Sequence, residues 1–180
     1  MQRVMIVGQP GAGKSVLARQ LGGLTGLPVV HIDLIHWCSG WQERTREEKT
    51  RLCQEVEAQP RWIFEGGHSA TWANRLDRAD TLIWIDMPLW LRLWRVLRRT
   101  LMGLGRNRPD LPEGCPERLA NLPEFLGFIW RTRRSSRAAM ARLVASAPAG
   151  KRVRHLQGRR AVTAFLQEVA NEKGRGFPRP

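Results

Sequence analysis

Eight residues near the N-terminus have the types and the spacing of a phosphate-binding loop. They read Gly8-Gln9-Pro10-Gly11-Ala12-Gly13-Lys14-Ser15 and fit the pattern GxxxxGK[S/T] without a gap. Glycines in such a loop let successive backbone N–H groups turn toward a phosphate, with the positive end of the following helix behind them. We expect Lys14 to act on the terminal phosphates of ATP and Ser15 to place its hydroxyl on Mg²⁺. The residues expected to hold the nucleotide are Gly8, Gly11, Ala12, Gly13, Lys14, Ser15 and Val16.

Two other interpretations of the loop are weaker. A dinucleotide fingerprint GxGxxG that starts at Gly11 would need a glycine where Val16 stands. A tight turn that contains a lysine by chance would not require a strand before it and a helix after it. Both flanking elements are expected here, because residues 4–7 form a short apolar run and the segment from Lys14 to Leu21 favours a helix that stops at Gly22-Gly23.

The remaining elements follow the same rhythm of strand and helix. Thr45 and Glu48 form a capping box at the start of a helix that reaches Ala58, and a long helix is expected from about Pro123 to Ala147. Alternating strands and helices predict an α/β fold with an open five-stranded parallel sheet, helices on both faces and ligands at the carboxyl ends of the strands. We expect the tail from Gly174 to Pro180 to fray. The five strands are expected at residues 4–7, 27–32, 62–64, 81–85 and 152–156.

Length and charge describe one domain with a basic middle section. The chain of 180 residues suits a single domain, 1–180, with an acceptor-side segment at 34–60 and a lid at 102–122, where glycines and prolines interrupt the rhythm. The formal net charge is +14, and residues 92–160 hold 17 basic and four acidic side chains. A positive block of this kind indicates a polyanionic ligand, such as nucleotide phosphates, a nucleic acid or an acidic lipid surface.

Three cysteines without a CxxC pair do not form a disulfide framework, so a reducing cytoplasm is the simplest compartment. No secretory signal is present at the N-terminus, and the most apolar window is interrupted by charges and a proline, so we expect a cytoplasmic protein without a membrane role. His31, His36 and Cys38 have a spacing that zinc ligands use, but no fourth ligand lies nearby in the sequence. We expect Cys115 to be structural.

With the loop, the strand order and the lid in view, the chain resembles the adenylate-kinase-like branch of the P-loop proteins. Within that branch it is similar to the family of DNA topology modulation proteins, up to about residue 166. The resemblance implies a three-layer kinase fold, ATP with Mg²⁺ and a lid that closes over the phosphates. The stretches that carry it are GQPGAGKS, HIDLIHW, WIFEGGHS, RLDRADTLIWIDMP and RPDLPEGCPER.

The resemblance also implies roles for individual residues. Glu65, followed by Gly66, occupies the position of an acidic residue that supports Mg²⁺ through water, although the typical residue there is Asp. Arg95 and Arg99 match two arginines, one near the adenine and one on the phosphates, and they share one helix face. Arginine suits this work because its planar fork binds phosphate oxygens in pairs. Further arginines expected to join when the lid closes are Arg108, Arg131 and Arg134, whereas Arg98, Arg118, Arg137 and Arg142 suit a solvated face.

The acceptor side departs from adenylate kinase. The Thr-Gly…Leu-Arg pattern that holds the acceptor nucleotide is absent, and His31-Ile32-Asp33 stands in its place. Asp33 is similar in position to the aspartate that meets the acceptor hydroxyl in shikimate-kinase-like enzymes, and a carboxylate there orients the hydroxyl for in-line attack. The other interpretation is a helix cap. Trp37, Trp41, Trp72 and His68 either line this end of the sheet or belong to the core.

Three functions follow from these residues. The first is a kinase that moves the γ-phosphate of ATP to a small acceptor, with Lys14, Asp33, Arg95, Arg99 and Arg134 as its catalytic residues. The second is a nucleic-acid-associated ATPase, for which charge is the only support because no nucleic-acid-binding motif is present. The third is a nucleotide-binding regulator, suggested by Glu65 in place of Asp. We expect a monomer, and duplex binding that survives near-physiological salt would favour the second function.

Overall fold

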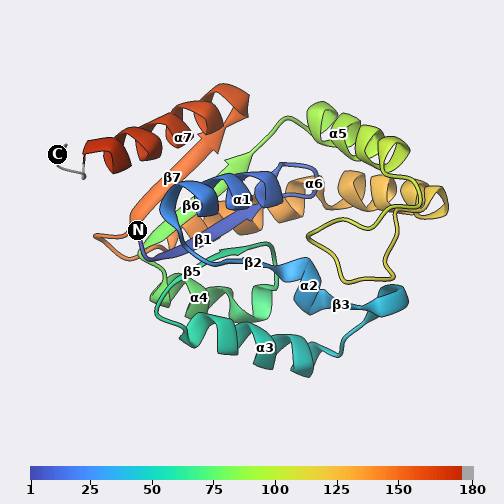
Figure 1. Cartoon of the computed structure of the whole chain (residues 1–180), viewed down its shortest axis with the longest axis horizontal. Coiled ribbons are helices and arrows are strands. Elements are labelled where there is room, and N and C mark those ends of the chain that lie inside the picture. Colours follow the sequence, from blue (N-terminus) through green and yellow to red (C-terminus); the bar gives the residue numbers. More distant parts are fainter. Residues whose placement is uncertain (176–180) are drawn as a thin grey trace.

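Five parallel strands form the centre of the chain in the computed structural model, which describes residues 1–175 (Figure 1). The strand order is β2-β5-β1-β6-β7, and every neighbouring pair is parallel. This arrangement confirms the expected α/β fold. The elements in chain order are β1 (Arg3–Gly8), α1 (Lys14–Thr25), β2 (Val29–His31), α2 (Ile32–His36), β3 (Trp37–Cys38), β4 (Gln42–Glu43), α3 (Arg46–Ala58), β5 (Trp62–Glu65), α4 (Trp72–Arg78), β6 (Thr81–Asp86), α5 (Leu89–Met102), α6 (Leu122–Ala145), β7 (Arg152–Gln157) and α7 (Gly158–Arg175).

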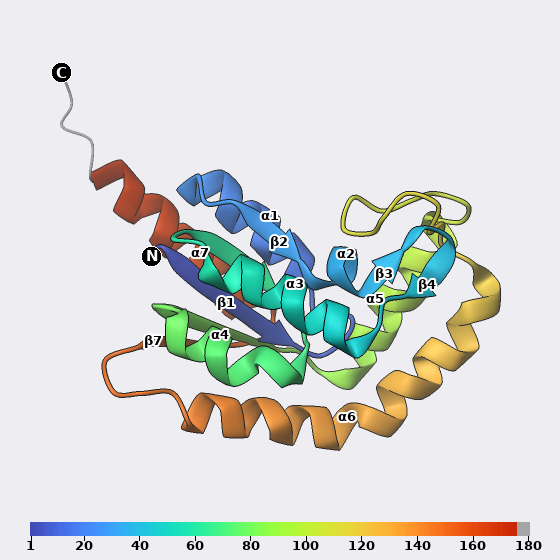
Figure 2. The same ribbon diagram turned by 90° about the horizontal axis from the view of Figure 1, so that it is seen from below.

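Helices cover both faces of the sheet. Alternate residues of β1 point to opposite faces, as in any strand. Val4 and Ile6 pack in one core with Leu17 of α1 and with α7, whereas Met5 and Val7 pack in a second core with residues of α3, α4 and α6. Figure 2 shows α1 and α7 on one side of the sheet and α3, α4 and α6 on the other. The sheet therefore has a buried core on each face and leaves its carboxyl end for a ligand.

The first helix runs further than the sequence indicated. We expected it to stop at Gly22-Gly23, but α1 continues to Thr25 and ends at Gly26, whose backbone has the left-handed conformation (φ 70°). Gly22 serves packing instead, because a Cβ at this position would lie 2.5 Å from Cγ2 of Val29. The helix can approach β2 only where no side chain intervenes. The expectation of a helix stop at this position was therefore wrong.

The second strand is shorter than expected. Only Val29–His31 pair with β5, and the chain then enters the short helix α2, which carries Asp33. The capping box of Thr45 is confirmed, since its side chain accepts a hydrogen bond from the Glu48 amide and its own amide donates to the Glu48 carboxylate. The other strands and the long helix α6 lie within about two residues of their expected bounds.

Residues 103–121 connect α5 to α6 as a loop at the carboxyl end of the sheet, beside the short hairpin of β3 and β4 (Figure 2). We call this loop the lid, after the role expected from the sequence. Within residues 1–175, no helix is both long enough and apolar enough to cross a bilayer. Fraying was expected from Gly174 onward, but α7 is still helical at Gly174. Residues 176–180 lie outside the described part.

Candidate active site

The phosphate-binding loop joins β1 to α1 and depends on its glycines. Gly11 and Gly13 have left-handed backbones, with φ of 77° and 99°. A Cβ on Gly11 would lie 2.6 Å from the carbonyl oxygen of Arg92, and one on Gly8 would lie 2.8 Å from that of Ile85. Non-glycine residues would therefore push the loop away from the elements that hold it. Because the first turn of α1 has neither a side-chain cap nor an acidic residue, its N-terminus suits an anion.

Ser15 and Glu65 meet beside this loop. The Ser15 hydroxyl donates a hydrogen bond to Oε1 of Glu65 at 2.9 Å, and Glu65 ends β5 in the parallel ladder next to β1. The Glu65 residue is only 2% exposed. A hydroxyl beside a carboxylate is a hard oxygen pair, which fits Mg²⁺ held partly by protein and partly by substrate phosphates and water. The two residues expected from the sequence to support a metal are thus neighbours.

His31 is a partner of Glu65 that the sequence reasoning did not single out for this role. Its Nδ1 lies 2.8 Å from the same Oε1, and the register pairs His31 directly with Glu65. Burial alone would raise the pKa of Glu65, but the hydrogen bond from His31 and the charge of Lys14 outweigh it and hold that pKa below its ordinary value. Glu65 is therefore a carboxylate at neutral pH. Of the residues with the spacing of zinc ligands, His31 contacts Glu65, whereas His36 contacts Glu43.

Asp33 faces the lid. Nη2 of Arg108 lies 3.7 Å from Oδ2 of Asp33, and the same guanidinium contacts Asp110 at 3.8 Å and Glu117 at 3.4 Å. Burial and then the charge of Glu65 raise the pKa of Asp33, while Lys14 and Arg108 act in the opposite direction. One lid arginine therefore connects the end of β2 to the lid. A carboxylate with a raised pKa is suited to accept a proton.

Asp110 is a second residue that the sequence reasoning missed. It lies in the lid, is 7% exposed and forms ion pairs with Arg19 of α1 at 3.9 Å and with Arg108 at 3.8 Å. Burial would raise the pKa of Asp110, but Arg108 and hydrogen bonds hold it below its ordinary value. The sequence signal was its place in the RPDLP stretch, two residues after Arg108, yet nothing in that spacing indicates that the lid folds down to the phosphate-binding loop.

The lid packs on the hairpin of the acceptor-side segment. The amide of Gly40 donates to the carbonyl of Gly114 at 3.1 Å, and the Trp41 indole donates to the carbonyl of Pro116 at 3.2 Å. Cys115 is fully buried, and its Sγ lies 3.2 Å from the carbonyl oxygen of Cys38. This supports the structural role expected for Cys115. Lid and acceptor-side segment therefore meet through several hydrogen bonds.

Helix α5 turns its arginines toward the site. Nη1 of Arg95 donates to the carbonyl of Ala12 at 2.8 Å, so this residue touches the phosphate-binding loop directly. Nε of Arg99 lies 3.0 Å from Oε1 of Glu117 in the lid. Burial lowers the pKa of both arginines, which nevertheless remain cationic. Arg92, which was not predicted, is 2% exposed and lies against the loop near Pro10.

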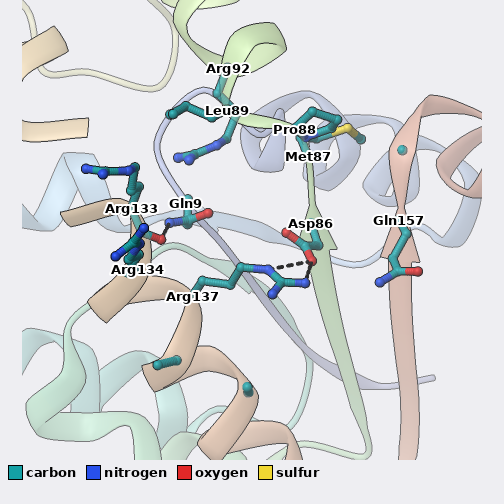
Figure 3. Close-up of a pocket in the computed structure, with 13 residues that line it drawn as sticks. Gln9, Asp86, Met87, Pro88, Leu89, Arg92, Arg133, Arg134, Arg137 and Gln157 are labelled. Carbon is teal, nitrogen blue, oxygen red and sulfur yellow. Dashed lines mark hydrogen bonds and ion pairs between the residues drawn. The ribbon is translucent and has the colours of Figure 1, made fainter. Parts of the chain in front are cut away.

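The structure brings most of the predicted site residues together. Lys14 and Ser15 lie with Asp33 and Glu65 at one place, and the lid adds Arg108. Arg95 and Arg99 approach from α5. The side chain of Val16 is 52% exposed, so its contribution is limited to its backbone amide. The structure places Arg134 elsewhere, in a cleft between α6 and β6 with Gln9 and Asp86 (Figure 3).

Comparisons with known proteins agree with this geometry at the level of the fold. The chain shares its fold with several solved kinases. No family model matches the chain, and no curated protein matches its sequence. Solved structures do match. Shikimate kinase from Acinetobacter baumannii in complex with shikimate has a TM-score of 0.56 and 18% identity, covering 99% of this chain and 96% of that one.

Two further neighbours are of the same kind. Shikimate kinase from Bacteroides thetaiotaomicron has a TM-score of 0.55 and 14% identity, covering 95% of this chain and 97% of its own. A gluconokinase from Sinorhizobium meliloti 1021 has a TM-score of 0.51 and 11% identity, covering 97% and 92%. Identities this low show the fold alone. None of these three structures is a DNA topology modulation protein, so that narrower family stays a proposal.

Proposed function

We propose that this chain is an ATP-dependent phosphotransferase that moves the γ-phosphate of ATP to a hydroxyl group of a small acceptor. The observation that carries the proposal is the position of Asp33. Its carboxylate shares one electrostatic environment with Lys14 and Glu65 of the phosphate site, and the lid residue Arg108 contacts it at 3.7 Å. An ATPase has no acceptor hydroxyl to orient, whereas a kinase that phosphorylates a hydroxyl can use a carboxylate to orient it.

The proposed reaction divides among these residues. The loop amides and Lys14 would hold the phosphates of ATP. Ser15 and Glu65 are the residues that would hold Mg²⁺, which would neutralise phosphate charge. Asp33 accepts a hydrogen bond from the acceptor hydroxyl and takes its proton. The acceptor oxygen then forms a bond to the γ-phosphorus as the bond to the bridging oxygen of ADP breaks. Arg99 and Arg108 stabilise the transferred group, and the lid excludes water.

Two observations support a class of acceptor: a missing sequence pattern and the names of the similar solved structures. The pattern that holds an acceptor nucleotide in adenylate kinase is absent from this chain. Two of the similar structures are named for shikimate and gluconate chemistry, and a further one, with a TM-score of 0.50, is named a sugar kinase. We therefore propose a small hydroxylated molecule as the acceptor, bound between the segment at 34–60 and the lid at 102–122, in a monomeric, cytoplasmic protein.

A nucleic-acid-associated ATPase, as the resemblance to DNA topology modulation proteins suggests, is the second candidate. The observation that favours it is the outer surface of α5 and α6, where the exposed tryptophans Trp90, Trp94 and Trp130 stand among arginines. Exposed aromatic rings within a positive surface suit stacking by unpaired bases. Under this function, single-stranded DNA would stimulate ATP hydrolysis, and no small acceptor would receive phosphate.

The test measures phosphate transfer from Mg·ATP to a panel of hydroxylated metabolites, nucleosides and nucleoside monophosphates. We expect transfer to one hydroxylated class, loss of both transfer and hydrolysis in Lys14→Ala, and a fall in kcat of about 100-fold or more in Asp33→Asn with ATP binding retained. Asp77→Asn is the matched control, because this exposed residue of α4 undergoes the same chemical change away from the site. Full transfer by Asp33→Asn would show that the acceptor side is wrongly placed.

A further inference from the structure

A cavity lies beside the phosphate-binding loop, on the side of α6. It has a volume of about 800 Å³ and is formed by α6 and by the carboxyl ends of β6 and β7 (Figure 3). The side chains that determine its character are Gln9, Asp86, Arg92, Arg133, Arg134 and Arg137. The site residues Lys14, Ser15, Asp33 and Glu65 do not line it. None of the functions proposed above uses this cleft.

The charge of the cleft is strongly positive. Four guanidinium groups line it against one carboxylate, Asp86. That carboxylate is already paired, because Nη2 of Arg137 lies 2.9 Å and its Nε 3.1 Å from Oδ2 of Asp86. Three arginines therefore remain without a carboxylate among the lining residues. Figure 3 shows Arg92 above Gln9 and Arg133 beside it, with Arg134 and Arg137 on the same helix as Arg133.

Arg92 is the most informative of these residues. It is 2% exposed, and within residues 1–175 its Nε has no hydrogen-bond partner. Its Nη1 reaches the carbonyl of Pro10 only at 3.5 Å. A buried guanidinium with one long hydrogen bond is unfavourable unless an anion meets it. Asp86 acts on Arg92 through its charge but accepts no hydrogen bond from it, so the described residues leave most of the hydrogen-bonding capacity of this guanidinium unused.

We propose that this cleft binds the phosphate group of a small phosphorylated molecule, at a second site in addition to the phosphate-binding loop. Arg92 and Arg134 bind the phosphate oxygens, since planar guanidinium groups match them in pairs. Arg133, whose guanidinium stacks on the Trp130 ring and donates to the Trp130 carbonyl, adds positive charge beside them. The remaining lining includes Met87, Leu89 and two alanines of α6, which form an apolar surface for the body of the ligand.

The cleft is also in contact with the phosphate-binding loop. Nε2 of Gln9 donates to the backbone carbonyl of Arg133 at 2.7 Å, which ties the start of the loop to α6. The backbone of Arg92 lies against Gly11 on the other side. A ligand in the cleft therefore contacts residues that also hold the loop.

The test is isothermal titration calorimetry with inorganic pyrophosphate at about 0.15 M salt and without Mg²⁺. We expect the wild-type chain to bind two equivalents, one at the loop and one in the cleft. Lys14→Ala should keep the cleft equivalent. In the Lys14→Ala background, both Arg134→Glu and Arg92→Met should weaken the remaining equivalent by at least about tenfold, because each removes one charge-assisted contact.

The matched control is Arg61→Glu in the same background. Arg61 is an exposed residue just before β5, at the opposite end of the sheet, and this variant changes the net charge as Arg134→Glu does. Retained binding in Arg61→Glu and lost binding in Arg134→Glu support the cleft. A single equivalent in the wild type that Lys14→Ala abolishes would overturn the proposal, and so would equal weakening by Arg61→Glu and Arg134→Glu. These outcomes do not depend on whether the chain transfers phosphate.

A nucleoside diphosphate titrated into Lys14→Ala then distinguishes two sources of the phosphate. Binding tighter than that of pyrophosphate identifies a nucleotide, whose base uses the apolar surface. Equal binding identifies recognition of the phosphate group alone. Both results support the site, whereas binding of neither ligand to Lys14→Ala contradicts it.

Discussion

A buried ion pair holds the turn that follows Glu65, and its removal gives the sharpest test of the packing. Arg75 of α4 and Glu57 of α3 are both completely buried, with Nε of Arg75 2.9 Å from Oε1 of Glu57. Nη1 of Arg75 also donates to the carbonyl of Gly66 at 3.0 Å, and its guanidinium lies 3.7 Å from the ring centroid of Phe64. Arg75 therefore connects two helices to the end of β5.

We predict that Arg75→Met lowers the free energy of unfolding by about 3 to 5 kcal/mol. The methionine keeps much of the side-chain length but leaves the Glu57 carboxylate buried without its cation, and breaking a buried pair from one side has a cost of this size. For a domain of this length, the loss corresponds to a fall in Tm of about 6 to 20 °C. The double variant Glu57→Leu/Arg75→Met should be less destabilised than Arg75→Met, because no isolated charge remains.

Urea unfolding followed by tryptophan fluorescence measures these differences. The control is Arg51→Met, since Arg51 forms an ion pair with Glu55 at 2.5 Å on the surface of α3, where both side chains are more than half exposed. An exposed pair of this kind contributes less than about 1 kcal/mol. The reasoning fails if Arg75→Met and Arg51→Met lose equal stability, or if the double variant is at least as destabilised as Arg75→Met.

Three further predictions concern pH and packing. Because the pKa of Glu65 is lowered on folding, its stabilising contribution is present above the ordinary carboxyl pKa and is lost as the pH falls through the lowered one; Glu65→Gln should flatten this acid limb in thermal unfolding curves. The pKa of Asp33 is raised, but its side chain is 41% exposed, so ionised Asp33 opposes folding only weakly at neutral pH, and Asp33→Asn should raise Tm slightly at pH 7, with a gain that shrinks as the pH falls through the raised pKa. Gly22→Ala should destabilise the chain by about 1 to 3 kcal/mol because its Cβ meets Val29, whereas Gly23→Ala, which meets nothing within 4 Å, should be neutral or stabilising by up to about 1 kcal/mol; urea unfolding distinguishes them.

The sequence was sufficient for the sheet and for the loop because both depend on local patterns. Apolar runs of strand length and the spacing of Gly8, Gly13 and Lys14 are visible along the chain, and the structure places them as expected. The predicted end of the first helix was wrong because Gly22 is needed for close packing against Val29. This contact joins two elements, so the local sequence pattern does not reveal it. Local signals thus located the elements better than they located the ends of α1 and β2.

The spacing of residues along the sequence could not predict some contacts of the candidate site. His31 reaches Glu65 through strand register, since the two residues are opposite each other in β2 and β5 although 34 positions apart. Asp110 reaches Arg19 of α1 only because the segment at 103–121 folds back onto this helix. Arg134 shares a helix with other arginines, and the choice between the phosphate site and the cleft depends on which face of α6 it occupies.

Helix α5 shows how the demands of a site change a hydrophobic pattern. Its residues Trp90 and Trp94 are 67% and 56% exposed, whereas Arg92 is 2% exposed. A helix placed by hydrophobicity alone would turn the other way. α5 lies against the phosphate-binding loop, where the carbonyls of Pro10 and Ala12 accept hydrogen bonds from Arg92 and Arg95. Tryptophans in their place would leave those carbonyls unpaired and would remove positive charge from beside the loop, so the exposed apolar face of α5 follows from the chemistry of its inner face.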